Sequence, residues 1–164
     1  MIAECRLTVH SSGTRFAGRH NSGVKTYVRF PAPTNEEIAE VESTIGYSLP
    51  SALVELYAKR GNGGFGPDYG LLGLGSGHVT DQGDTALGLY RVFNEPDAED
   101  PGWAWPKHLL PILHVGCAIH YCIDLASPDN PVVKFDPNGF GPGEDWQSAF
   151  SVAFPKLEPW LGGL

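Results

Sequence analysis

The sequence predicts an α+β domain in which a helical hairpin over residues 34–60 packs on a sheet formed by later segments. Two observations carry this prediction. Apolar residues recur at helical spacing in two stretches that each end at a glycine, and short apolar runs at 71–74, 109–115, 120–125 and 132–135 are separated by turn residues. A chain of 164 residues is long enough for one domain with a hydrophobic core.

The first helix of the hairpin begins with a capping box at residues 34–37. The Thr34 hydroxyl can accept a hydrogen bond from the backbone N–H of Glu37, whose side chain can reach back to the N–H of Thr34. Gly46 ends the helix. The apolar stripe has the i, i+3, i+7 spacing of an amphipathic helix and consists of Ile38, Val41 and Ile45.

The second helix opens at residues 49–50, where Pro50 stands near the first helical position that proline favours. Its apolar face consists of Leu53, Leu56 and Tyr57. Gly61 closes the helix, and we expect it to adopt the left-handed conformation that only glycine takes without a Cβ penalty.

A glycine-rich segment over residues 60–75 follows the hairpin, and Gly61, Gly63 and Gly66 fit the pattern G-x-G-x-x-G. The dinucleotide fingerprint needs a strand before it and a helix after it, so that the helix N-terminus faces the pyrophosphate. Here the predicted order is reversed, because a helix precedes the segment and a strand over residues 69–74 follows it. The segment therefore reads as a structural turn.

The second half of the chain contains short elements. Asp84 is a candidate N-cap for a short helix that carries Leu87, Tyr90 and Phe93, and an acidic loop follows over residues 94–102. The strands at 109–115 and 120–125 are joined by a turn near Gly116, and Asp124 is placed to bond a turn. A short helix is expected near the end of the sequence, within residues 154–161.

The first thirty residues form a separate extension in this interpretation. Cys5, Leu7 and Val9 alternate with polar residues, which suits a strand with one solvated face, and residues 11–23 are typical of a loop. The sequence is therefore divided into an N-terminal extension over 1–30, a strand and loop added to the domain, and the domain itself over 31–164.

The charge is uneven: residues 1–30 hold five of the eleven Lys and Arg against one Glu, so they carry +4 of a net charge of −8 and the remainder carries −12. An acidic body argues against nucleic-acid binding and is compatible with a basic protein partner. No signal peptide or membrane span is visible, and three cysteines make no disulfide framework. A cytoplasmic protein is the expectation.

His114, Cys117, His120 and Cys122 are zinc-friendly residues within a short span. A turn at Gly116 would separate His114 from His120, and the paired C-x₂₋₄-C spacing of zinc sites is absent, so we expect no metal and no cofactor. Cys117 could also serve as a nucleophile with a histidine base, but a small buried residue is the ordinary role of cysteine. No catalytic residue is assigned.

Several ordered fragments resemble the SUKH superfamily, the Smi/Knr type of domain, over residues 31–164. The fragments are Thr34-Asn35-Glu36-Glu37-Ile38, Glu42, Ile45-Gly46, Leu49-Pro50, Leu56-Tyr57, Gly61-Asn62-Gly63-Gly64, Trp105-Pro106, Leu110-Pro111-Ile112, Gly116-Cys117, Tyr121-Cys122-Ile123-Asp124, Leu157 and Trp160-Leu161. The resemblance implies an α+β fold with an N-terminal helical hairpin packed on a mostly antiparallel sheet with flanking short helices.

The resemblance also implies a function. It indicates a non-catalytic immunity protein that binds and neutralises a secreted bacterial toxin by direct contact, nucleases being one class of such toxins. The alternatives are a scaffold or regulatory interaction protein of the same fold, and a metal- or Cys-dependent enzyme. Family members bind unrelated toxins, so the fold does not fix the partner.

The candidate partner-binding residues are acidic or aromatic and lie in the loop-rich middle of the chain. Acidic side chains would steer a basic toxin, and aromatic side chains would anchor it. The alternative is that the tryptophans belong to the core and the acids are simply solvated. The candidates are Tyr69, Asp81, Asp84, Glu95, Asp97, Glu99, Asp100, Trp103 and Trp105.

Overall fold

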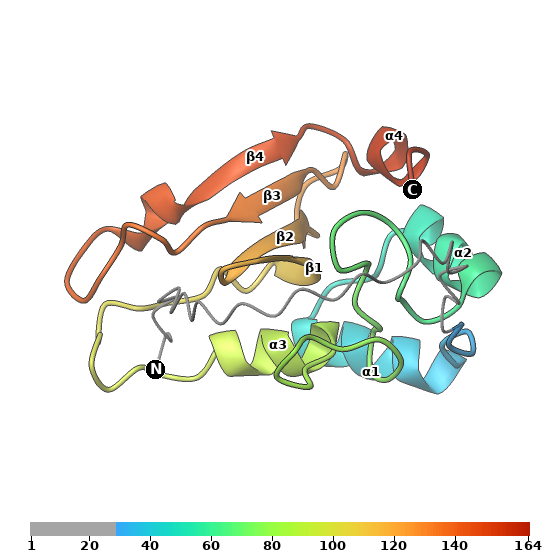
Figure 1. The fold of residues 1–164 in the computed structure, drawn as a ribbon, viewed down its shortest axis with the longest axis horizontal. Helices are drawn as coiled ribbons and strands as arrows, with labels where there is room; N and C mark the ends of the chain where they lie inside the picture. The colour runs from blue at the N-terminus through green and yellow to red at the C-terminus, as the bar shows by residue number, and fades with distance from the viewer. Residues whose placement is uncertain (1–28) are drawn as a thin grey trace, which may run out of the picture.

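The computed structural model describes residues 29–164, which form four α-helices and a four-stranded antiparallel sheet (Figure 1). The strand and loop expected within residues 1–28 lie outside this range. The α+β class and the helical hairpin are confirmed. The elements are α1 (Asn35–Ile45), α2 (Ser51–Arg60), α3 (Ala86–Phe93), β1 (Leu109–Gly116), β2 (Ile119–Asp124), β3 (Val132–Phe135), the 3₁₀ helix η1 (Trp146–Ala149), β4 (Phe150–Phe154) and α4 (Leu157–Leu161).

The capping box at the start of α1 is confirmed. The Thr34 hydroxyl accepts from the Glu37 N–H at 3.2 Å, and the Glu37 carboxylate accepts from the Thr34 N–H at 3.1 Å. Gly46 ends the helix in the left-handed conformation, with φ 81° and ψ 17°. Val41 and Ile45 are buried, while Ile38 packs against the core from a half-buried position.

Helix α2 differs from the prediction at both ends. Pro50 is the N-cap residue and lies just before the helix rather than inside its first turn. Gly61 has the expected positive φ of 101°, but its ψ of 177° is extended, so the conformation is not the left-handed helical one. Only glycine adopts this region readily. Leu53 and Tyr57 are fully buried, and the Tyr57 hydroxyl donates to the Leu72 carbonyl at 2.5 Å.

The sheet is a meander in the order β1-β2-β3-β4, so every strand pairs with its neighbour in the chain. The predicted strands over 109–115, 120–125 and 132–135 are confirmed. Sequence reasoning missed β4. It also predicted a strand over 69–74, which is wrong: only Leu71 forms an isolated bridge with Leu113, and the Leu72 N–H donates to the Ile112 carbonyl at 2.8 Å. The glycine-rich loop thus lies along the outer edge of β1.

The helices lie on different sides of the sheet (Figure 1). Helix α3 begins at Thr85, whose hydroxyl accepts from the Gly88 N–H, so Asp84 is not the N-cap. Its Phe93 ring contacts Phe135 at 5.7 Å between centroids, which places α3 against one face of the sheet. An ion pair of 2.9 Å between Arg91 and Glu40 joins α3 to α1, and α2 packs against α4.

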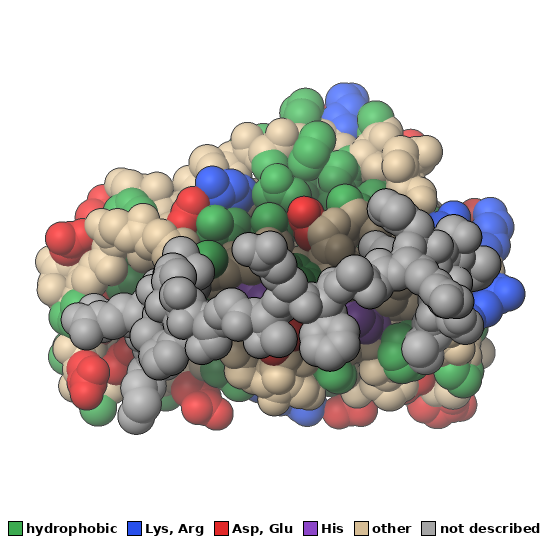
Figure 2. Space-filling view, in the orientation of Figure 1, with side chains coloured by type: hydrophobic (Ala, Val, Ile, Leu, Met, Phe, Trp, Pro, Cys, Tyr) green, Lys and Arg blue, Asp and Glu red, His purple; other side chains and the backbone are tan. Residues whose placement is uncertain are grey.

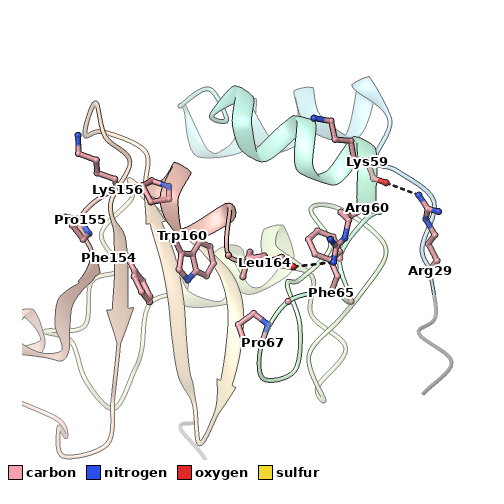
Figure 3. Close-up of a pocket in the computed structure, with 15 residues that line it drawn as sticks. Arg29, Lys59, Arg60, Phe65, Pro67, Phe154, Pro155, Lys156, Trp160 and Leu164 are labelled. Carbon is pink, nitrogen blue, oxygen red and sulfur yellow. Dashed lines mark hydrogen bonds between the residues drawn. The ribbon is translucent and has the colours of Figure 1, made fainter. Parts of the chain in front are cut away.

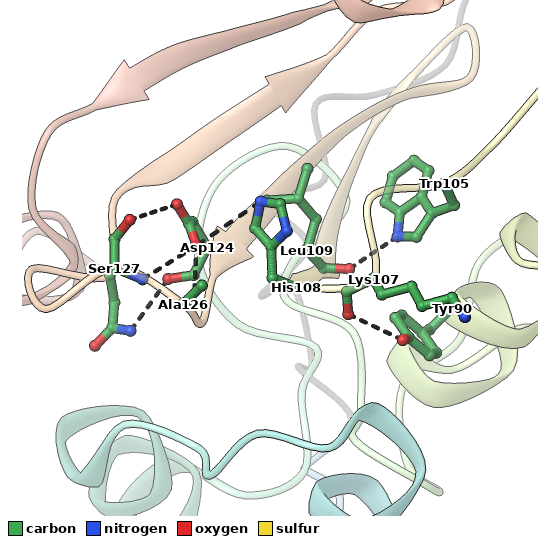
Figure 4. Close-up of polar contacts among 9 residues, drawn as sticks. Tyr90, Trp105, Lys107, His108, Leu109, Asp124, Ala126 and Ser127 are labelled. Carbon is green, nitrogen blue, oxygen red and sulfur yellow. Dashed lines mark hydrogen bonds and ion pairs between the residues drawn. The ribbon is translucent and has the colours of Figure 1, made fainter.

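Turns at one end of the sheet are held by side chains (Figure 4). Asp124 accepts from the N–H groups of Ala126 and Ser127 at 2.9 and 3.3 Å and from the Ser127 hydroxyl at 2.7 Å. The predicted turn-bonding role of Asp124 is therefore confirmed. Among the helices of residues 29–164, none has the length and apolar character needed to cross a bilayer.

Candidate partner-binding surface

The nine candidate residues do not form one surface, because the structure places them at three levels of exposure. Tyr69, Asp81, Glu95 and Glu99 are exposed. Asp84, Asp97 and Trp103 are half-buried. Asp100 and Trp105 are buried.

The two tryptophans attach the acidic loop to the sheet. Trp105 is 4% exposed, and its indole N–H donates to the Leu109 carbonyl at 2.9 Å (Figure 4). Its ring lies 4.5 Å from that of Phe93. Trp103 donates to the Phe93 carbonyl at 3.0 Å and meets Trp146 edge to face at 4.9 Å. Trp105 therefore belongs to the core, which corrects its expected role as an anchor for a partner.

Asp100 is also a structural residue. Its carboxylate accepts hydrogen bonds from the indole N–H of Trp146 and from the backbone N–H groups of Gly102 and Gly143, the latter two at 3.1 and 3.4 Å. The bond from Trp146 is the main cause that lowers the pKa of Asp100 below its ordinary value of 3.8. The side chain clamps two loops together, so the expectation that it faces a partner is corrected.

This clamp makes stability depend on pH. A carboxyl whose pKa is lowered in the folded state stabilises the fold above its unfolded-state pKa, and this contribution is lost as the pH falls through the folded-state value. We expect Asp100→Asn to lower the urea midpoint of unfolding at neutral pH, and its difference from the wild type to disappear in acid. Glu99→Gln is the matched control, because this exposed neighbour loses the same charge. If the difference in urea midpoint between Asp100→Asn and the wild type stayed the same across the pH range, the stabilising role of the Asp100 carboxylate would be contradicted.

Tyr69 is the exposed end of a column of three stacked rings. Its side chain is 57% exposed, and its ring stacks on His114 at 5.4 Å with an interplanar angle of 20°. His114 stacks in turn on His120 at 5.0 Å. The strand register makes these two histidines direct cross-strand partners, so the turn at Gly116 brings them together, contrary to the prediction.

His120 connects this column to the core. It is 5% exposed, and its ring meets Phe93 edge to face at 5.3 Å. Burial, followed by the charge of His114, lowers the pKa of His120 to about 4, so the ring is neutral at physiological pH. With Nδ1 assigned as the protonated nitrogen, it donates to the Ala118 carbonyl at 2.9 Å. The Tyr69 ring is therefore connected, through the half-buried His114, to a buried and neutral ring of the core.

The hairpin tip beside Tyr69 has an unusual backbone. Cys117 and Ala118 have φ angles of 49° and 59°, which is the type I′ pattern that normally selects Asn and Gly. Asp68, directly before Tyr69, has φ 52°. A Cβ on Gly116 would lie 3.4 Å from the Tyr69 ring, so the ring packs directly over the strand end. Backbone strain of this kind occurs preferentially at functional sites.

The zinc-friendly residues do not make a metal site in the part of the chain that the structure describes. No group of three or more His, Cys, Asp or Glu side chains within residues 29–164 could hold a metal ion. Cys117 lies exposed on the hairpin turn, whereas Cys122 is buried and its thiol pKa is raised by burial. The exposed features near Tyr69 are its own ring and the carboxylate of the preceding residue, Asp68.

The family follows from a comparison of the sequence with known protein families. Residues 32–158 match the sequence model of the SMI1 / KNR4 family (SUKH-1), which covers more than half of the chain. The chain belongs to the SUKH-1 family. No curated protein matches it. SUKH-1 proteins are generally non-catalytic, and membership supports a role of the immunity-protein type in general, with a protein as the partner.

The SUKH-1 domain also contains a groove that sequence reasoning missed (Figure 3). It has a volume of about 1250 Å³ and lies between the end of α2, the glycine-rich loop and the β4–α4 segment. Its apolar centre is formed by Phe65, Phe154, Trp160 and Leu164. No sequence pattern marks it, because its lining residues come from three segments that are distant in the sequence, at Arg29, 59–67 and 154–164.

Proposed function

We propose that this SUKH-1 protein is an immunity protein that binds and neutralises a cognate secreted bacterial toxin by direct contact, with Tyr69 at the centre of the contact. The observation that carries the proposal is the stacked column under Tyr69. An exposed aromatic ring held in place before binding loses little conformational freedom in the complex. Tyrosines in such positions are typical hot spots of protein interfaces.

The charges of the described residues support a basic toxin. Asp81, Glu95 and Glu99 are exposed, and Asp68 adds a carboxylate directly beside Tyr69. Exposed carboxylates of this kind raise the rate at which a basic partner associates. Such a protein needs no catalytic residue or cofactor, and it would act in the cytoplasm, where an incoming toxin reaches its target. Within this proposal residues 31–164 are the SUKH-1 domain and residues 1–30 an extension of it.

The test is binding to the cognate toxin, which is sought among the products of the neighbouring genes. We expect Tyr69→Ala to raise the dissociation constant, measured by titration calorimetry, about tenfold or more. Tyr47→Ala is the matched control, because Tyr47 is also a partly exposed tyrosine (37%) but lies in the α1–α2 turn.

The possible results separate function from position. Wild-type protein that neither binds the toxin nor protects cells that express it would contradict the immunity function. Equal losses for both tyrosine variants, or no loss for either, would leave the function standing and remove Tyr69 from the centre of the interface.

A further inference from the structure

Strand β4 is an edge strand of the sheet. It is the last strand in the order, and within residues 29–164 no backbone hydrogen bond reaches its outer side. The opposite edge is partly covered, because Leu71 bridges to Leu113 on β1. Strand β4 has the sequence Phe-Ser-Val-Ala-Phe, without a charge or a proline, and Val152 and Phe154 are 64% and 37% exposed. Natural proteins protect such edges unless another chain pairs with them.

The groove begins where β4 ends. Phe154 belongs to the strand and also lines the groove, followed by Pro155 and Lys156 (Figure 3). Its volume of about 1250 Å³ exceeds the usual range of small-molecule sites, which is about 300–1000 Å³. An extended chain that paired with β4 would therefore continue into a space large enough for its side chains.

Positive charge is concentrated around this groove. Residues 29–164 contain seven Lys and Arg against eighteen Asp and Glu, yet four of the seven line the groove. Lys156 lies on one side of the apolar centre, and Arg29, Lys59 and Arg60 lie on the other (Figure 3). Figure 2 likewise shows Lys and Arg gathered at the α2 end of the molecule.

Among the described residues, these cations make only contacts that a ligand could replace. Arg29 donates to the Lys59 carbonyl, and Arg60 donates to the Leu164 carbonyl and lies over the Phe65 ring, so neither pairs with a carboxylate side chain of residues 29–164. Lys59 pairs with Glu55 at 3.5 Å and Lys156 with Asp129 at 3.2 Å, and both pairs are exposed. Exposed ion pairs contribute little and exchange readily.

We propose that the β4 edge and this groove together bind an extended, acidic segment of a partner polypeptide. The segment would add a strand beside β4 and place its carboxylates among the four cations, with its apolar side chains on Phe154 and Trp160. A nucleic acid fits less well, because the protein carries a net charge of −8 and would repel its phosphates. This proposal concerns a different surface from Tyr69 and does not depend on the toxin.

The probe is a short peptide in which glutamate alternates with leucine, labelled with an uncharged dye and followed by fluorescence anisotropy. We expect it to bind, and its affinity to fall with added salt. The same peptide with lysine in place of glutamate, and a single-stranded oligonucleotide, are expected to bind much more weakly. Equal binding of the lysine peptide, or tighter binding of the oligonucleotide, would overturn the proposal.

Variants locate the site. Arg60→Gln and Lys156→Gln are each expected to raise the dissociation constant of the peptide by about two- to fivefold. The double variant should raise it by roughly the product of the two single factors. Lys107→Gln, an exposed lysine that does not line the groove, is the matched control and should change nothing. Val152→Pro tests whether the peptide pairs with β4, because proline removes one backbone donor from the strand and keeps the exposed side chain small. Circular dichroism confirms that each variant is folded.

Self-association is the remaining outcome. If β4 instead paired with β4 of a second copy, sedimentation would show a dimer that the acidic peptide does not dissociate, and that result would also overturn the proposal. A monomer whose peptide affinity falls in the two glutamine variants and not in Lys107→Gln supports it.

Discussion

Gly61→Ala is expected to lower the free energy of unfolding by about 3 kcal/mol. The φ of 101° with an extended ψ is a conformation that side chains with a Cβ rarely adopt. A Cβ at this position would also overlap the carbonyl group of Phe30, on the segment that leads into α1. The backbone of that segment is fixed nearby, because the Asn62 N–H donates to the Pro31 carbonyl at 3.0 Å. Neither the Phe30 segment nor the Gly61 segment can move away without breaking this hydrogen bond.

The matched control is Gly46→Ala at the end of α1. Gly46 also closes a helix with a positive φ, of 81°, but a Cβ there would have no neighbour within 4 Å. We expect it to cost about 1 kcal/mol, the penalty for the left-handed conformation alone. Chemical denaturation of both variants measures the difference. Equal losses would show that the close approach to Phe30 contributes nothing.

Asn62→Ala is expected to cost about 2–3 kcal/mol. Asn62 is 1% exposed, and its side-chain oxygen accepts from the Leu74 N–H at 2.8 Å. Its amide nitrogen donates to Glu37 at 3.3 Å and to Ser76 at 3.2 Å. Alanine would leave a buried backbone N–H without a partner and would disconnect the glycine-rich loop from α1, so the loss exceeds that of an ordinary hydrogen bond.

Asn138→Ala is the comparison for this prediction. Asn138 also donates through its amide nitrogen, to the Cys117 carbonyl at 2.9 Å and to Asp136 at 3.0 Å, but it is exposed. Water can replace those bonds, so we expect a loss below about 1 kcal/mol. Urea unfolding measures the loss of stability in both variants. A larger loss for Asn138→Ala than for Asn62→Ala would contradict the argument that burial makes the Asn62 bonds costly to lose.

The sequence was most informative where the determining contacts are local. The capping box at Thr34 and Glu37 and the stop at Gly46 depend on residues within one helical turn, so the pattern alone identifies them. The strand predicted over 69–74 was wrong because the apolar pattern does not show where the backbone turns. Its leucines are buried on all sides, as in a buried strand, but Gly70 has a φ of 84° and the Gly73 N–H donates to His78, which turns the backbone out of the sheet.

The candidate site depended on distant contacts, and there the sequence was less informative. Nothing near Asp100 shows that Trp146 will donate to it, and nothing near Trp105 shows that Phe135 and Phe150 will cover its ring. Tyr69 was chosen for its residue type, but its support by His114 appears only once the hairpin brings the two histidines together.

The meander has a consequence for how the chain folds. Because each strand pairs with the next one in the chain, the sheet can form through a series of short loop closures that cost little entropy. Helices α1 and α2 are likewise joined by a short turn, so the closure between them is also local. Joining the two halves requires the glycine-rich loop to reach β1, which is a much longer closure and therefore a later step. Strain introduced at Gly61 should then accelerate unfolding more than it slows folding.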